Sequence, residues 1–420
     1  MSDMFKFNLQ CFAESDIVAS DPNLRQMIWS ADLWTSAKKQ LYFAKFIGKT
    51  AEFIIQEKTE LTKAAGDQIT VPLIPRLIAP GVSGDEVLSG NEEPMQAFDF
   101  AVTVDQMAKS IRLKGNMAQQ KTQYSLRSAA KTVLSQWMQE YMDQYIFTAL
   151  TTAYTPNRVV YPAGRSAENA IVAGDILTLA EISKAKRKAT LAGQPYAIST
   201  SGGTVSATQG GFVLTGSSTA FNTDFAVGDL ITVGTQANYV VSITSATVLN
   251  VAAAWGTTFS GSSYSAIRYN GARSKLRPVM VNGQPFFVCV IHPYQERDLR
   301  NDPDWIGAQQ SFAAWRGYDN PIFKGGIGLY DGVIIHTHEN VVLSATGNGS
   351  TPTQVGHGLL MGAQAGVMAI AQEPTWVEDP LYDYQRKPGF ATSLIWGVKK
   401  SVFNGEDFAV VQVLSSAVAE

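Results

Sequence analysis

The stretch from Tyr124 to Leu150 carries the longest helical pattern of the chain. It contains no glycine or proline in 27 residues, and its apolar residues recur at steps of three and four, the spacing of an amphipathic α-helix. The pattern gives two adjoining apolar stripes: Leu126, Ala130, Val133, Trp137, Tyr141, Tyr145 and Ala149 in one, and Leu134, Met138, Met142 and Ile146 in the other. At 1.5 Å per residue the helix would be about 40 Å long. A helix of this length predicts a domain that is organised along it.

Residues 53–113, which precede this helix, are predicted to form one extended β-hairpin. The segments EFIIQEKTEL and DQITVPLIPRLI are rich in β-branched residues and alternate in polarity, with a turn signal at AAGDQ between them. FDFAVTVDQMAKSIRL, residues 98–113, predicts a further long strand or a pair of strands. The tip of the hairpin would be GVSGDEVLSGNEEP, residues 81–94.

Length and composition predict a chain of two or three folding units, since domains average about 100 to 200 residues and this chain has 420. Charged residues make up only 16%, and the net charge of -3 gives no overall attraction to nucleic acid or a membrane. Cys11 and Cys289 show no C-x-x-C spacing, so we expect two free thiols in a protein made in a reducing cytoplasm. Without a signal-peptide pattern or a run of 18 apolar residues, we expect a soluble chain that is not exported.

Residues 197–267 differ in composition from everything around them. They contain no Lys, Arg, Glu or His, and their only charged residues are Asp224 and Asp229. Short β-branched segments such as GDLITVG and NYVVSITSATVLNVA alternate with turn residues. We therefore predict an inserted small all-β domain, bounded at 197–269, in a host domain of mixed α and β structure.

The segments on either side of this insert have an alternating α/β pattern. Thr178 and Glu181 form a capping box that begins a helix, and its basic run, Lys184 to Lys188, is expected to be a solvated face near the negative end of the helix dipole rather than a phosphate or DNA contact. PFFVCVIH and DGVIIHTHE predict strands, PYQERDLR and DWIGAQQSFAAWRG predict helices, and the C-terminal segment is β-rich with a tight turn at NGED.

The acidic, glycine-rich stretch 81–94 does not match a known ligand loop. Its four carboxylates come as two adjacent pairs, whereas an EF-hand needs oxygen ligands at alternating positions. Adjacent side chains of a strand point to opposite faces, and four carboxylates repel phosphate. We therefore expect no metal and no cofactor at this stretch.

The four histidines do not indicate a catalytic or metal site. His336 and His338 share one face of a strand, as a two-histidine metal site would, but no third ligand follows by spacing, so we expect a partly exposed pair at a strand end. His292 is expected to cap the following helix, and His357 to lie in a loop or at a strand end. No G-x-S-x-G, H-E-x-x-H or C-x-x-C motif accompanies them.

Acidic and basic residues are segregated between the hairpin and the start of the long helix. From Leu77 to Ala108 there are six acids and no Lys or Arg: Asp85, Glu86, Glu92, Glu93, Asp99 and Asp105. From Lys109 to Gln139 there are six bases and no acid: Lys109, Arg112, Lys114, Lys121, Arg127 and Lys131. An acidic hairpin tip that lies on the basic surface of a neighbouring subunit would explain the pattern. The alternative is that hairpin and helix neutralise each other within one chain.

Several segments together make the chain resemble the major capsid proteins of tailed bacteriophages related to the coat protein of coliphage N-four, which have the Hong Kong 97 capsid fold. The resemblance is carried by FAKFIGK (43–49), LTKAAGDQITVPLIPRL (61–77), GVSGDEVLSGNEEP (81–94), FDFAVTVDQMAKSIRL (98–113), HPYQERDLR (292–300), DNPIFKGGIGLYDGVIIHTHE (319–339), GAQAGVMAIAQ (362–372) and GFATSLIWGVKKSVFNGEDFAVV (389–411). They occur in the order of that family and cover nearly all of the chain outside the insert. The insert itself we regard as lying outside the family's common pattern.

The resemblance implies an α+β chain divided into seven segments. These are an N-terminal arm (1–52), an extended loop with flanking strands (53–113), a spine helix of the peripheral domain (114–159), a first part of the axial domain (160–196), the inserted β domain (197–269), a second axial part (270–372) and C-terminal strands of the peripheral domain (373–420). The loop tip, with Gly84, Asp85, Glu86, Glu92 and Glu93, would contact a neighbouring subunit.

The resemblance also implies what the chain does and what it meets. It would assemble with itself, as hexamers and pentamers, into the icosahedral head shell around double-stranded DNA. It would do so in the host bacterial cytoplasm, with portal, scaffolding and decoration proteins as further partners, with non-specific DNA contacts at the inner face and with no membrane. The outer half of the loop has no lysine, so covalent cross-linking through a loop lysine is not expected, and neither is enzyme activity.

A second interpretation belongs to another class: a phage protein that binds or hydrolyses glycans, with the β insert as its carbohydrate module. Glycosidases need two carboxyl groups about 5 to 9.5 Å apart in one cleft, and nothing in the sequence indicates such a pair. The aromatic residues of the insert are spaced as a β-barrel core: Phe212, Phe221, Phe225, Tyr239, Trp255, Phe259 and Tyr264.

Overall fold

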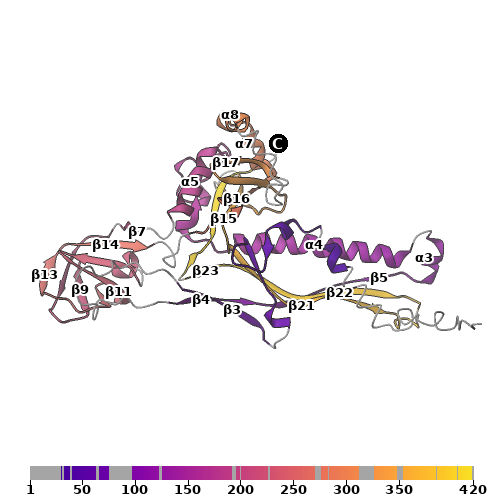
Figure 1. The fold of residues 1–420 in the computed structure, drawn as a ribbon, viewed down its shortest axis with the longest axis horizontal. Helices are drawn as coiled ribbons and strands as arrows, with labels where there is room; N and C mark the ends of the chain where they lie inside the picture. The colour runs from indigo at the N-terminus through magenta and orange to yellow at the C-terminus, as the bar shows by residue number, and fades with distance from the viewer. Residues whose placement is uncertain are drawn as a thin grey trace, which may run out of the picture.

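The computed structural model describes residues 30, 33–37, 40–62, 66–74, 97–122, 125–191, 195–198, 200–225, 228–269, 276–281, 283–311, 326–347, 353–384, 386–403 and 405–418. Three parts can be distinguished in Figure 1: a long, flat body of sheet and helix, a sheet domain above one end of it, and a small β domain beyond that end. Among the described helices, none has the length and apolar character needed to cross a lipid bilayer.

The body is a five-stranded sheet covered by one long helix. The strand order is β1 (Ile47–Gly48), β2 (Ile55–Lys58), β21 (Gly366–Asp379), β22 (Gly389–Lys400) and β5 (Asp105–Arg112). Helix α4 (Leu126–Thr151) begins at the N-cap Ser125, whose side chain accepts the N–H of Ser128. The helix predicted at 124–150 is therefore present.

The two apolar stripes of α4 are buried to different extents. Leu134, Met138 and Ile146 are at most 1% exposed, whereas Val133 and Tyr141 on the other stripe are 55% and 38% exposed. Periodicity alone shows that both stripes are apolar. The stripe with Leu134 and Met138 is fully covered, whereas the stripe with Val133 and Tyr141 is only partly covered, since its Trp137 and Ala149 pack against the main core.

The strands predicted at 53–113 divide between two sheets. β3 (Gln68–Leu73) pairs with β4 (Phe98–Thr103), and after Val104 the chain continues as β5, which pairs with β22 instead. The crossing lies at Gly397, where a Cβ atom would stand 2.0 Å from the carbonyl oxygen of Thr103, so only glycine allows the approach. The hairpin tip, residues 81–94, lies outside the described residues.

The upper domain is an eight-stranded mixed sheet with helices beside it. Its main path is β17 (Gly326–Tyr330), β18 (Val333–Thr337), β16 (Gln284–Ile291), β20 (Thr353–Met361), β25 (Val410–Ser416) and β6 (Val159–Val160), with β15 (Val279–Val281) on β16 and β19 (Leu343–Gly347) on β20. The helices are α5 (Leu179–Thr190), α7 (Pro293–Arg300) and α8 (Pro303–Ser311). The predicted capping box of Thr178 and Glu181 is present, and His292 caps α7 as predicted.

The C-terminal segment does not belong to one domain, so the expectation for 373–420 needs correction. β22 lies in the body sheet, but β25 pairs with β20 and β6 in the upper sheet. All seven residues of β25 are buried, which suits a position inside a covered sheet. The expected boundary at 372/373 also falls inside the continuous strand β21.

The small β domain has a core of its own. It contains β7 (Pro195–Ala197), β8 (Thr204–Ala207), β9 (Val213–Ser217), α6 (Phe221–Asp224), β10 (Leu230–Val233), β11 (Gln236–Ser245), β12 (Val248–Val251), β13 (Phe259–Ser262) and β14 (Tyr264–Tyr269). Its buried cluster, centred on Trp255, Phe221 and Leu249, is separate from the main core. Of the aromatic residues predicted for this core, Phe212 is instead 53% exposed.

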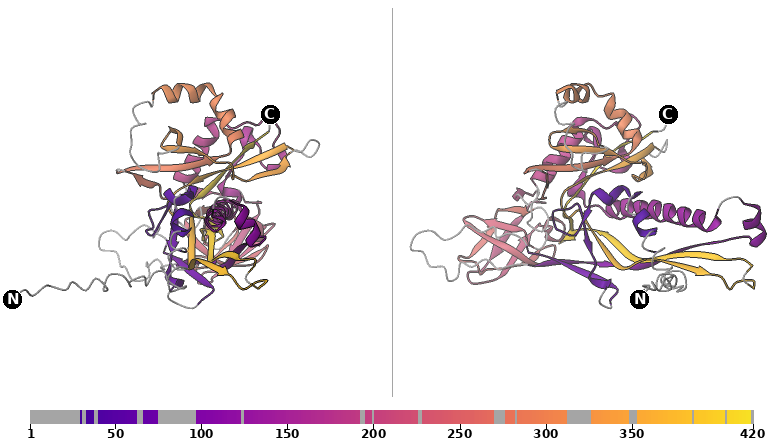
Figure 2. Two further views of the ribbon diagram at one scale, coloured as in Figure 1. Left: turned by 90° about the vertical axis from the view of Figure 1, so that its right-hand side faces the viewer. Right: turned by 45° about the vertical axis from the view of Figure 1, so that its right-hand side comes forward.

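Short elements complete the described chain. They are the 3-10 turns η2 (Tyr42–Lys45), η3 (Glu60–Thr62), η4 (Pro156–Arg158), η5 (Pro162–Gly164) and η6 (Glu168–Ala170), helix α3 (Asn116–Lys121) and the hairpin of β23 (Val402–Phe403) and β24 (Glu406–Asp407). This hairpin contains the predicted NGED turn and lies where the body meets the upper domain. Figure 2 shows the same junction from two further directions.

Candidate functional site

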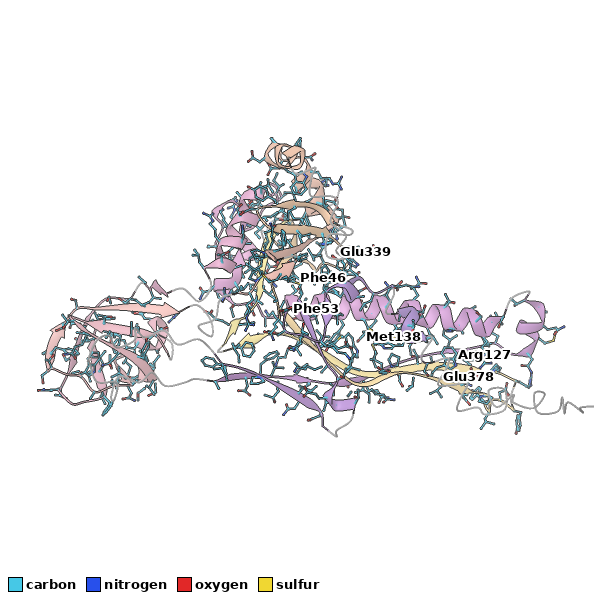
Figure 3. All side chains as sticks on the ribbon, in the orientation of Figure 1. Phe46, Phe53, Arg127, Met138, Glu339 and Glu378 are labelled. Carbon is cyan, nitrogen blue, oxygen red and sulfur yellow. The ribbon has the colours of Figure 1, made fainter. Side chains whose placement is uncertain are left out.

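The six bases predicted as an acceptor surface lie at one end of the body. Lys109 and Arg112 are on β5, Lys114 follows it, Lys121 ends α3, and Arg127 and Lys131 are on the first two turns of α4. Figure 3 labels Arg127 at this end, beside Glu378. The structure therefore brings the six together, because β5, α3 and the start of α4 meet there.

Two of the six bases are neutralised within the chain. Arg127 donates its Nε–H to Glu378 at 2.8 Å, and Glu378 also accepts the indole N–H of Trp376 at 2.9 Å. Arg112 pairs with Asp379 at 2.9 Å and lies 3.9 Å from the ring centre of Tyr382. Sequence reasoning missed Glu378 and Asp379 as partners, and their only signal was an acidic pair at the end of a β-rich segment.

The remaining bases have a different environment. Lys109 lies over the ring of Trp137, with 5.7 Å between the ammonium nitrogen and the ring centroid. Lys114 and Lys121 are exposed, and no ion pair joins them to another described residue. Positive charge therefore remains at this end of the body after the two internal ion pairs are formed.

The base of the predicted hairpin lies at the opposite end of the strand. β4 and β5 follow one direction in Figure 1, so Phe98 and Arg112 are about 45 Å apart at 3.3 Å per residue. Each half of the 22 residues from 75 to 96 could extend about 36 Å. A tip that turned back along its own chain could therefore reach Lys109, about 36 Å from Phe98, but would fall short of Arg112.

A Glu, His and Ser cluster in the upper domain does not have the geometry of a hydrolytic site. His357 Nε2 lies 2.9 Å from Ser344 Oγ and 3.2 Å from Glu168, and Tyr154 donates to the same carboxylate at 2.7 Å. A catalytic triad needs serine and carboxylate on opposite ring nitrogens. Here both lie at Nε2, while Nδ1 has no hydrogen-bond partner among the described residues. The cluster fixes η6 against β19 and β20, and His357 lies inside a strand rather than at its end.

The other histidines also correct an expectation. His336 is fully buried, not partly exposed, and its Nδ1 lies 3.3 Å from the ammonium nitrogen of Lys45. Burial lowers the pKa of Lys45 to about 8. His338 packs on Tyr42, with 4.3 Å between ring centroids. In the part of the chain that the structure describes, no three His, Cys, Asp or Glu side chains gather as metal ligands do.

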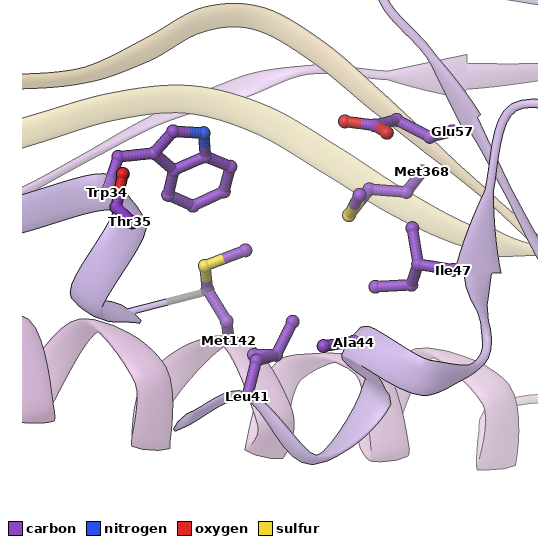
Figure 4. A pocket seen from close by; sticks show the side chains of 8 residues that line it. All are labelled: Trp34, Thr35, Leu41, Ala44, Ile47, Glu57, Met142 and Met368. Carbon is purple, nitrogen blue, oxygen red and sulfur yellow. The ribbon is translucent and has the colours of Figure 1, made fainter. Parts of the chain in front are cut away.

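A cavity of about 430 Å³ lies between the N-terminal segment, α4 and the body sheet (Figure 4), lined by Trp34, Thr35, Leu41, Ala44, Ile47, Glu57, Met142 and Met368. Glu57 is the one carboxylate among these residues. Glycoside hydrolysis requires two, so the cavity does not fit the glycan-hydrolysing alternative.

Three lysines of the basic run of α5 are engaged within the chain rather than wholly solvated as expected, while Arg187 is exposed. Lys186 pairs with Asp331 at 2.5 Å, Lys184 with Glu181 at 3.7 Å, and Lys188 donates to the carbonyl oxygen of Val159 at 2.6 Å. No contact for phosphate or DNA needs to be assigned to it.

The architecture defined by these parts is that of phage capsid subunits. The structure is similar to the capsid protein of Ralstonia phage GP4, with a TM-score of 0.65 and 25% identity over 90% of this chain and 92% of that one. It is also similar to the capsid of cyanophage Pam1, with a TM-score of 0.60 and 20% identity over 90% and 92% of the two chains.

The family comparison agrees with the fold. The profile of the phage capsid protein family matches residues 18–215 and 230–419, so the chain belongs to this family. The major capsid protein of Pseudomonas phage KPP25 is 28% identical over 417 residues, which cover 94% of this chain and 96% of that protein. The chain is thus a major capsid protein of a tailed phage, whose copies assemble into the head shell.

The same match corrects the expectation about the insert. We regarded 197–269 as lying outside the family's common pattern, but the profile runs through it and leaves only residues 216–229 unmatched. The unusual composition of the segment had suggested a foreign module. Most of the small β domain is instead part of the pattern that the family shares.

Proposed function

We propose that the subunit has the Hong Kong 97 arrangement in detail and that its shell encloses double-stranded DNA. The body would be the peripheral domain with α4 as its spine, and the upper sheet would be the axial domain at the centre of hexamers and pentamers. The separate five-stranded sheet of the body and eight-stranded sheet of the upper domain support this division. Electron micrographs of particles from cells that express the chain test it, because soluble small species alone would contradict shell formation.

We infer further partners from the same function. Portal, scaffolding and decoration proteins would join the shell during assembly in the bacterial cytoplasm, and packaged DNA would meet its inner face without sequence preference. The chain would act as a structural protein, without enzyme activity and without a membrane partner.

The contact that we propose to orient neighbouring subunits joins the acidic loop tip of one copy to the basic end of another. The tip comprises Gly84, Asp85, Glu86, Glu92 and Glu93, and the acceptor surface comprises Lys109, Arg112, Lys114, Lys121, Arg127 and Lys131. Its main support is the length argument: a fully extended tip could reach Lys109 of its own chain but falls short of Arg112. Opposite charges across an interface guide association and fix its register.

Charge reversal tests this contact. Changing Asp85, Glu86, Glu92 and Glu93 to lysine is expected to leave the subunit folded, because the described cores are already formed by other residues, and to abolish or misdirect particles in electron micrographs. The matched control adds Lys114→Glu and Lys121→Glu, which restores opposite charges and should recover part of the particle yield. Normal particles from the reversed tip alone would contradict the proposal.

A further inference from the structure

The cavity in Figure 4 lies where the N-terminal segment meets α4 and the body sheet. Met142 of α4 and Met368 of β21 are each 1% exposed, and Leu41, just before η2, is 7% exposed. The helical residues 33–37 add Trp34 and Thr35 to the lining. A volume of about 430 Å³ and a mostly apolar lining are typical of a site for a small organic molecule.

Glu57 is the charged residue among the described residues of this lining, and strand pairing fixes its direction. Glu57 and Met368 are register partners in the parallel pair of β2 and β21, so their side chains project from the same face of the sheet. Two residues before Met368, a Cβ atom on Gly366 would stand 3.1 Å from the side chain of Leu150 in α4. The carboxylate of Glu57 therefore projects from the face that α4 covers, and it is half-buried there.

Trp34 faces the cavity from the other side. Figure 4 shows its indole ring and the carboxylate of Glu57 on opposite sides of the space. An aromatic face attracts a cation, and a carboxylate attracts it through charge and hydrogen bonds. A carboxylate has about four acceptor positions, so Glu57 can accept from a ligand in addition to its contacts within the chain. These two residues therefore favour a ligand with one positively charged group.

The rest of the lining favours an aliphatic chain behind that group. The thioethers of Met142 and Met368 are polarisable and adapt to an irregular apolar ligand. One water molecule takes about 30 Å³ of liquid volume, and a methylene group is of similar size, so the cavity has room for about 14 such groups. A second charge at the far end of the chain would lie against Leu41 and Met142, where burial of an unpaired charge is costly.

We propose that this cavity binds an aliphatic ammonium ion with a chain of about six to ten carbon atoms, its ammonium group between Glu57 and Trp34 and its chain against the two methionines. Such a ligand touches residues 33–37, α4 and β21 at once, and so holds the N-terminal segment on the body. The site is separate from the contacts that form the shell, and its occupancy is tested independently of them.

Isothermal titration calorimetry with alkylammonium chlorides tests the site on the full-length chain. From butylammonium to octylammonium, we expect the affinity to rise about fourfold for each added methylene group, because each one leaves water for the apolar lining. Glu57→Gln should weaken the binding of hexylammonium about tenfold or more, since the charged acceptor is lost. The uncharged 1-hexanol is the matched control, and its binding should be the same in the two proteins.

A filled cavity shows where the ligand binds. Ala44 lines the cavity and is exposed, so Ala44→Trp is expected to leave the subunit folded, as judged by circular dichroism, and to abolish the binding of octylammonium. In the unchanged chain, octylammonium should slow amide hydrogen exchange in residues 40–47, because it fixes this segment to α4. The Ala44→Trp variant should show no such slowing.

Three results would overturn the proposal. They are the absence of alkylammonium binding to the unchanged chain, binding of hexylammonium that Glu57→Gln leaves as strong as before, and binding of octylammonium that persists in folded Ala44→Trp. Normal particles in electron micrographs, alongside any of these results, would leave the capsid function intact while removing the ammonium site.

Discussion

Asp143 lies on the buried side of α4, where its carboxylate accepts the backbone N–H groups of Tyr42 at 3.0 Å and Phe43 at 3.4 Å. In this way it satisfies the free donors at the start of η2 and fixes the N-terminal segment to the helix. Burial raises the pKa of Asp143 to about 6, even though the two backbone hydrogen bonds oppose the shift. The side chain of Asp143 therefore holds the N-terminal segment on the helix, although its burial favours the neutral, protonated carboxyl group.

Stability should consequently depend on pH through this residue. Its pKa is higher in the folded than in the unfolded chain, so its contribution is present below about pH 4 and is lost as the pH rises through 6. We expect the free energy of unfolding to fall by about 2 kcal/mol from this source between pH 4.5 and 7.5. Urea titrations at both pH values, on wild type and Asp143→Asn, measure it. An equal pH dependence in the two proteins would contradict the assignment.

At the scale of elements, two ion pairs connect the distal end of strand β21 to its neighbours, and their environments differ. Arg127 and Glu378 are 34% and 27% exposed, and Glu378 also accepts the indole N–H of Trp376, whereas Arg112 and Asp379 are 42% and 48% exposed. An exposed ion pair contributes little to the free energy of unfolding, because water and salt screen it. A partly buried carboxylate that accepts from several donors contributes more.

Alanine substitutions should reveal this difference. We expect Glu378→Ala to lower the free energy of unfolding by about 1 to 2 kcal/mol, because Arg127 and Trp376 lose their shared acceptor. The neighbouring Asp379→Ala is the matched control, with an expected loss of about 0.5 kcal/mol or less. Urea unfolding of the three proteins at one pH compares them, and equal losses would show that the Trp376 hydrogen bond adds nothing.

The sequence predicted elements better than it predicted their partners. The spine helix, the caps at Thr178 and His292 and the small β domain follow from local patterns, and all are present. Two features depend on residues far away in the chain. They are the depth to which each stripe of α4 is buried and the pairing of β25 with the upper sheet rather than with the body sheet. The same holds for the candidate site, where the six bases follow from the sequence but the partners of Arg112 and Arg127 come from β21, more than 250 positions later.

At the scale of the whole molecule, a buried ion pair is one of several contacts that join the body to the upper domain. Lys400 and Asp407 lie 2.6 Å apart with side chains only 3% and 1% exposed. Lys400 also donates to the carbonyl oxygen of Ala153, and Asp407 accepts the N–H of Thr155 just after α4. Since body and upper domain also share one continuous buried core, we infer that they move as one unit.

The small β domain is attached differently, which leads to the last prediction. Its core is separate, and its two ends meet where the N–H of Ile198 donates to the carbonyl oxygen of Ala266 at 3.0 Å. A short Gly/Ser bridge can therefore replace residues 200–266 without strain on the host sheet. We expect the shortened chain to form particles, seen by electron microscopy, because the junction at Lys400 and the basic end of the body are untouched.

The control for this deletion keeps the domain but removes its core, for example by Trp255→Asp. That variant should assemble less well than the deletion, since an unfolded domain exposes apolar surface that the deletion lacks. Complete loss of particles from the deletion, with a folded subunit by circular dichroism, would show that the small β domain makes contacts on which the shell depends. In that case, the match of the family profile to residues 197–215 and 230–269 would indicate that the family shares this domain because the shell needs its contacts.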